Sequence, residues 1–125
     1  MTRSNRAFLG AVAIMSVTAG PASAHTEVVR TSPVSGATVT VIPRRITITY
    51  EGSLLRVVNV TVTRRAGGQI ARSAKVNAKD AHQVVVLTSA GAPGRYMVAW
   101  KVQGADAHIV AGTFGFTVKR SRPTT

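Results

Sequence analysis

Residues 94–118, GRYMVAWKVQGADAHIVAGTFGFTV, contain two alternating segments on either side of a short turn. Before the turn, large apolar side chains occupy every second position of residues 96–102. After the turn, aromatic and valine side chains alternate with small or polar ones through residues 111–118. A period of two is typical of a strand with one buried face. This stretch therefore predicts two half-buried β-strands separated by a Gly/Ala-rich turn.

Further strands are expected earlier in the chain. Residues 46–50 and 58–62 show the same period of two. Residues 84–87 form a short apolar run that indicates a more fully buried strand, and residues 26–30 are expected to be the first strand. Segments rich in Gly or Pro separate the strands: a turn at residues 32–36, a hairpin connection at 66–68 and a turn at 91–94.

About seven short strands, with no helical periodicity after residue 24, predict an all-β domain. Their spacing, and a domain length near 100 residues, favour an immunoglobulin-like antiparallel β-sandwich with Greek-key connections. A closed barrel is the alternative that the pattern leaves open. The 125 residues, of which 45% are hydrophobic, fit one domain. Cysteine is absent, which excludes disulfides, thiolate metal sites and iron–sulfur clusters.

The first 24 residues have the composition of a secretory signal peptide. They contain its three parts in order: a positive start with Arg3 and Arg6, an apolar run at residues 7–17, and the A-x-A cleavage pattern Ala22-Ser23-Ala24. The apolar run is too short for a membrane anchor. We therefore expect cleavage after Ala24, with residues 25–125 forming the domain that is exported to a bacterial periplasm.

Cleavage after Ala24 would make His25 the first residue, with a free α-amino group. Its amine and one imidazole nitrogen could then close a chelate ring on a single ion. Asp106 and His108 lie two residues apart, and residues at that spacing in extended backbone point to the same side. Together these groups offer three nitrogens and one oxygen, a set that suits Cu(II). Zinc would accept the same donors less tightly.

Two other interpretations of these residues are open. Without His25, Asp106 and His108 could be a solvated loop pair that makes one hydrogen bond. The triplet Asp80-Ala81-His82 repeats the sequence of residues 106–108. We expect this copy to be a polar turn before the strand at residues 84–87, because the G-x-F-x-F continuation is missing there.

The chain is strongly basic, with a formal net charge of +12. Removal of Arg3 and Arg6 with the signal leaves 14 basic against 4 acidic residues, a net charge of about +10. A metal-free immunoglobulin-like module that binds an anionic partner through this surface is the alternative function. The basic residues are scattered along the sequence without a nucleic-acid motif, so solvated strand ends are favoured over a nucleic-acid partner.

Catalysis is not expected, because no arrangement of nucleophile, base and orienting group can be named among four acidic residues and three histidines. The residues favour a binding protein instead of an enzyme.

The features above resemble the CopC-type periplasmic copper-binding domain, the copper resistance protein C family. The resemblance rests on these parts: His25 after the signal, Ser32-Pro33 with Gly36, residues 94–100 (GRYMVAW), and Ala105-Asp106 through His108, Gly112, Phe114 and Phe116. It implies one Cu(II) per chain, with His25 (amine and ring), Asp106 and His108 as ligands. It also implies a monomer that buffers or transfers copper in copper homeostasis or resistance, with an inner-membrane copper transport protein as a partner.

The chain departs from the family pattern in the turn itself. Gly104 stands where the family usually has serine, Ala107 replaces a glycine, and Ile109 replaces a proline. If that glycine has a positive φ, Ala107 would be strained by about 1 kcal/mol or more. Some members bind Cu(I) through a methionine cluster, but the exported domain keeps only Met97. One thioether is no cluster, so no Cu(I) site is expected.

Overall fold

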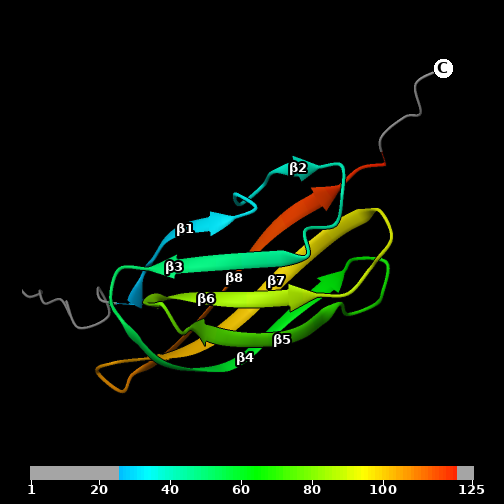
Figure 1. Cartoon of the computed structure of the whole chain (residues 1–125). Helices are drawn as coiled ribbons and strands as arrows, with labels where there is room; N and C mark the ends of the chain where they lie inside the picture. The colour runs from blue at the N-terminus through cyan, green and yellow to red at the C-terminus, as the bar shows by residue number, and fades with distance from the viewer. Residues whose placement is uncertain (1–25, 121–125) are drawn as a thin grey trace, which may run out of the picture.

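Two four-stranded β-sheets pack face to face in the computed structural model, which describes residues 26–120 (Figure 1). The strands are β1 (Val28–Ser32), β2 (Thr38–Val39), β3 (Arg45–Tyr50), β4 (Leu54–Arg64), β5 (Ala71–Asn77), β6 (Asp80–Thr88), β7 (Gly94–Gly104) and β8 (Ile109–Val118). The predicted all-β sandwich is confirmed, and the described residues do not form a closed barrel.

The strand order is β1-β3-β6-β5 in one sheet and β2-β8-β7-β4 in the other. All neighbouring pairs are antiparallel except β2 with β8, which is parallel. Without β2, this is the four-plus-three arrangement of the immunoglobulin fold. The expected number of about seven strands thus corresponds to the seven longer ones, because β2 has only two residues.

The core lies between the two sheets and follows the predicted alternation. In β7, Tyr96, Val98 and Val102 are buried, whereas Met97 on the opposite face is 51% exposed. The other buried apolar side chains come from four more strands and one loop: Ile46, Ile48, Tyr50, Leu54, Val60, Val62, Ile70, Val84, Val86, Phe114, Phe116 and Val118. Trp100 is partly buried and packs against this core.

Tyr96 anchors the connection between β6 and β7 to the core. Its hydroxyl donates to the carbonyl oxygen of Ala92, 2.5 Å away and four residues earlier, as in the tyrosine corner of immunoglobulin-like domains. Its ring stacks on Phe116 of the neighbouring strand, with ring centroids 5.4 Å apart. The predicted turn at residues 91–94 is therefore fixed by a core side chain.

Three expectations about the strands were wrong. Residues 66–68 do not join a β-hairpin, because after a single bridge between Thr63 and Gln69 the chain crosses to the other sheet as β5. The side-chain oxygen of Gln69 accepts from the backbone N–H groups on both sides of this crossing. Residues 80–82 belong to β6 instead of a turn, and β1 begins at Val28 instead of residue 26.

The predicted signal peptide and His25 lie outside the described residues. Within residues 26–120, no helix has the length and apolar character needed to span a bilayer.

Candidate metal centre

The turn between β7 and β8 lies at one end of the sandwich, as the orange segment of Figure 1 shows. The backbone N–H of Gly104 donates to the carbonyl of His108 (2.9 Å), and the N–H of Ala107 donates to the carbonyl of Gly104 (2.9 Å). Ala107 has a φ of +75°. A three-residue loop whose last residue is left-handed is a common hairpin connection. The position of the family's glycine therefore does have a positive φ, and Ala107 occupies it.

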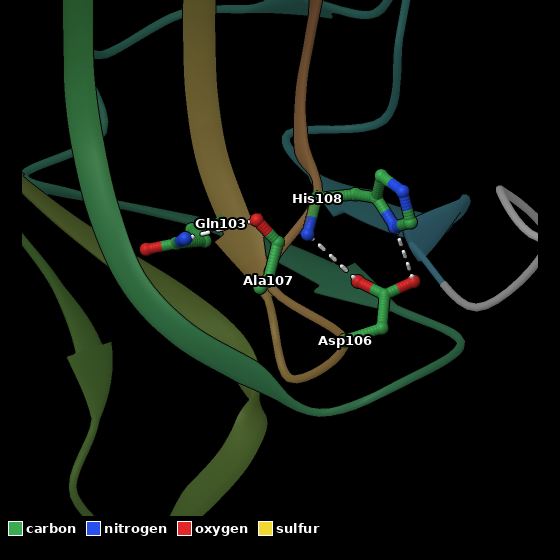
Figure 2. Close-up of polar contacts among 4 residues, drawn as sticks. All are labelled: Gln103, Asp106, Ala107 and His108. Carbon is green, nitrogen blue, oxygen red and sulfur yellow. Dashed lines mark hydrogen bonds and ion pairs between the residues drawn. The ribbon is translucent and has the colours of Figure 1, made fainter.

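Asp106 and His108 contact each other twice in this turn (Figure 2). The backbone N–H of His108 donates to Oδ1 of Asp106 at 3.1 Å, and Nδ1 of His108 lies 3.1 Å from Oδ2. The His108 side chain is 67% exposed and the Asp106 side chain 31% exposed. The turn brings the two groups together, whereas the sequence argument attributed their proximity to extended backbone.

The electrostatic state of Asp106 follows from these contacts. The hydrogen bond from the backbone N–H of His108 lowers the pKa of the Asp106 carboxyl, and the contact with the His108 side chain lowers it further. Hydrogen bonds to a carboxylate favour its charged form. Asp106 is therefore an ionised oxygen donor at neutral pH.

Residues outside the D-A-H triplet support the turn. The side-chain amide of Gln103 donates to the carbonyl of Ala107 at 2.9 Å (Figure 2), and the N–H of Ala105 donates to the carbonyl of Ser53 at 3.0 Å. Neither Gln103 nor Ser53 was predicted from the sequence to support the turn. Gln103 could have been found from its place next to the turn, but the contact with Ser53 depends on the pairing of β4 with β7.

The chain following His25 lies against the same turn. Thr26 is buried, with 4% exposure. Its Oγ1 lies 2.8 Å from the position that a Cβ on Gly104 would occupy, and Asp106 Oδ1 lies 3.1 Å from that position. The glycine at 104 thus leaves the space that the Thr26 side chain fills.

Within residues 26–120, no group of three His, Cys, Asp or Glu side chains is placed to hold one metal ion. Of the three predicted ligands, the structure brings Asp106 and His108 together, and His25 is outside the described residues.

The second triplet has a different environment. The N–H of His82 lies 3.0 Å from Asp80 Oδ1, as in the first triplet, but Nδ1 of His82 lies 3.1 Å from the backbone carbonyl oxygen of Glu51. The His82 imidazole therefore faces a backbone carbonyl oxygen instead of the Asp80 carboxylate. The second triplet thus lacks the adjacent carboxylate oxygen and imidazole nitrogen that Asp106 and His108 provide.

All four carboxylates of the chain lie at the end of the sandwich that carries this turn. Glu27 precedes β1, Glu51 follows β3, Asp80 begins β6, and Asp106 is in the β7–β8 turn. Antiparallel pairing brings these strand ends together, since Tyr50 pairs with Val28 and Thr49 pairs with Gln83. Arg56 near the start of β4 and Lys79 directly before Asp80 lie at the same end, so basic side chains accompany these carboxylates.

Comparison with known proteins shows where the chain is similar. The family model for the CopC domain matches residues 28–119. The structure is similar to CopC from Methylosinus trichosporium OB3b, with a TM-score of 0.71 and 23% identity, covering 81% of this chain and 100% of that one. It is also similar to PcoC, a methionine-rich copper resistance protein from Escherichia coli, with a TM-score of 0.66 and 23% identity, covering 77% and 100%. No curated protein sequence matches the chain.

Proposed function

This chain belongs to the CopC domain family, and from that premise we propose that it binds one Cu(II) ion through His25, Asp106 and His108. The protein then buffers or transfers copper in copper homeostasis or resistance. It acts as an exported monomer in the periplasm after cleavage behind Ala24, and it passes copper to an inner-membrane transport protein.

The observation that carries the proposal is the donor pair in the β7–β8 turn. Two ligand atoms about 2.0–2.2 Å from one ion and at a right angle to each other are about 3 Å apart. Asp106 Oδ2 and His108 Nδ1 are 3.1 Å apart. The turn therefore presents one oxygen and one nitrogen at a separation that a single ion can bridge with little rearrangement.

Two further nitrogens are proposed to come from His25. The position of Thr26 supports this, because Thr26 is buried against Gly104 beside Asp106. Neighbouring Cα atoms are about 3.8 Å apart along the chain, so a ligand from residue 25 needs only a short reach to the turn. An amine, two imidazoles and a carboxylate are donors suited to Cu(II).

The oxidation state follows from the donor types. PcoC is named as methionine-rich, whereas Met97 is the one methionine among the residues described here. Thioethers favour Cu(I), while nitrogen and oxygen donors in a tetragonal arrangement favour Cu(II). The ligands proposed for this chain thus point to Cu(II).

The test is an equilibrium titration of the chain starting at His25 with Cu(II) against a competing chelator. Removal of a direct ligand should cost at least as much as loss of a residue that only orients one, which is about tenfold or more. Asp106→Asn and His108→Ala should each weaken binding by that amount, whereas His82→Ala, the matched change in the repeated triplet, should leave it unchanged. A larger loss with His82→Ala would move the site to Asp80 and His82, and absence of Cu(II) binding would favour the metal-free module.

A further inference from the structure

Eight basic side chains lie at the end of the sandwich opposite the Asp106 turn. They come from the start of β3, β5 and β7, the end of β4 and the segments next to β3, β4 and β8: Arg44, Arg45, Arg64, Arg65, Arg72, Arg95, Lys119 and Arg120. We call this group the basic end. Arg64 is half-buried and the other seven are exposed. Residues that are scattered in the sequence are thus gathered by the fold at one end of the sandwich.

No carboxylate of the described residues neutralises the basic end. The four carboxylates of the chain lie at the other end, and the one ion pair found in residues 26–120 joins Asp106 to His108. β7 runs between the two ends over 11 residues, a length of roughly 33 Å at about 3.3 Å per residue. That distance exceeds the Debye length of about 8 Å at physiological ionic strength, so each end presents its own charge to the solvent.

The surface of the basic end is a row of shallow hollows. One, with a volume of about 480 Å³, is lined by Arg44 and Arg72. Another, of about 530 Å³, is lined by Arg64, Arg65 and Arg95. A third hollow has Ala90 and Gly91 in common with the first and Arg64 and Tyr96 in common with the second. The guanidinium groups are therefore spread around this end of the sandwich, where several of them could contact anionic groups at once.

From this surface we propose that the basic end binds anionic phospholipid headgroups at the surface of a bilayer. Guanidinium groups bind phosphate oxygens in a bidentate manner, and each exposed cation near an anionic bilayer adds about fivefold to binding. The hollow of Arg44 and Arg72 is also lined by Val41, which is 73% exposed. An exposed apolar side chain beside cations fits the boundary between headgroups and acyl chains.

The aromatic side chains of this end distinguish a lipid surface from a nucleic acid. Binding of single strands relies on exposed aromatic rings on which bases stack. At the basic end, Tyr96 and Phe116 are each 2% exposed and stack on one another inside the core. Phosphate contacts without stacking therefore favour the lipid.

Binding through the basic end would orient the domain. The β7–β8 turn is on the opposite side of the sandwich in Figure 1, roughly 30 Å away by the length of β7. Asp106 and His108 would then face away from the membrane. This orientation does not depend on copper binding, so it can be tested with the metal-free chain.

The first experiment measures sedimentation of the chain starting at His25 with vesicles at physiological ionic strength. Vesicles of phosphatidylglycerol and phosphatidylcholine in equal parts should bind it, and pure phosphatidylcholine should not. The triple variant Arg44→Gln, Arg65→Gln, Arg95→Gln should weaken binding on the order of 100-fold, from about fivefold for each cation. Lys75→Gln, Lys79→Gln, Lys101→Gln makes the same change in net charge outside the basic end, and should cost less than about tenfold.

The second experiment tests the orientation. The chain has no cysteine, so an environment-sensitive dye can be attached to Val41→Cys at the basic end or to Ala105→Cys at the opposite end. Vesicles should shift the emission of the dye on Val41→Cys alone. Circular dichroism of all variants checks that these exposed substitutions leave the fold intact.

Three results would overturn the proposal. Equal loss of binding by the two triple variants would show that net charge acts without a defined surface. An emission shift for the dye on Ala105→Cys would place the opposite end on the bilayer. Tighter binding to a single-stranded oligonucleotide than to vesicles of equal phosphate concentration would assign the surface to nucleic acid.

Discussion

Ala107 holds a backbone conformation that alanine disfavours, and Ala107→Gly should therefore stabilise the domain. Its φ of +75° lies in the left-handed region, where the Cβ of an L-residue costs about 1–2 kcal/mol. Glycine lacks this Cβ, but it gains more freedom in the unfolded chain, which costs about 0.4–1 kcal/mol. The free energy of unfolding should thus rise by about 0.5–1 kcal/mol.

The measurement is urea and thermal unfolding followed by circular dichroism. For a domain near 100 residues, 1 kcal/mol corresponds to about 4–8 °C in Tm, so a rise of about 2–8 °C is expected. Ala105→Gly is the matched control, because Ala105 belongs to the same turn and does not have a positive φ. That change should lower the free energy of unfolding, since it adds freedom to the unfolded chain without relieving strain.

The two substitutions are expected to change the free energy of unfolding in opposite directions, which makes the prediction testable. Both variants can keep the two backbone hydrogen bonds of the turn, because these involve no side chain. They join the Gly104 N–H to the His108 carbonyl and the Ala107 N–H to the Gly104 carbonyl. If Ala107→Gly destabilised the domain as much as Ala105→Gly, residue 107 would not be left-handed in solution. The turn shape that brings Asp106 to His108 would then need a different account.

Three further predictions concern the metal centre. A form of the protein that retains residues before His25 should lose most of its Cu(II) affinity while staying folded, as titration and circular dichroism would show, and mass spectrometry of the exported protein should begin at His25; equal affinity with the extension would exclude the amine as a ligand. Cu(II) affinity should fall from pH 7 to 5 as nitrogen ligands become protonated, whereas the lowered pKa of Asp106 keeps its carboxylate ionised over that range; a flat profile in titrations at several pH values would contradict three nitrogen donors. Gly104→Ser should destabilise the domain by about 1–3 kcal/mol in urea unfolding, because its Cβ would lie 2.8 Å from Thr26 Oγ1; unchanged stability would show that Thr26 can move aside.

The period of two predicted the strands that build the core. β3, β7 and β8 each bury the side chains of one face, as residues 46–50, 96–102 and 111–118 indicated. β5 was missed because none of its residues is fully buried, so its sequence lacks a strong alternation. β2 was missed because two residues cannot show a period.

The candidate site could be predicted only in part, for a physical reason. Asp106 and His108 meet within one turn, so their proximity depends on local sequence. Ser53 and Thr26 reach the same turn through long-range packing, which a period or a motif does not encode. The choice between the two D-A-H triplets likewise depended on the continuation after His108, since the local sequences are identical.

Two departures from the family pattern, at Gly104 and Ala107, lie in the β7–β8 turn that carries Asp106 and His108. Gly104, where the family usually has serine, leaves a space against which the Thr26 Oγ1 and the Asp106 Oδ1 both lie. Ala107, where the family has glycine, keeps the left-handed conformation, and Gln103 binds its carbonyl at 2.9 Å. Thr26 thus occupies the space beside Gly104, and the third loop residue is left-handed although it is an alanine. Because the strained alanine is held by hydrogen bonds on both sides, the turn can present Asp106 and His108 together without the family's glycine.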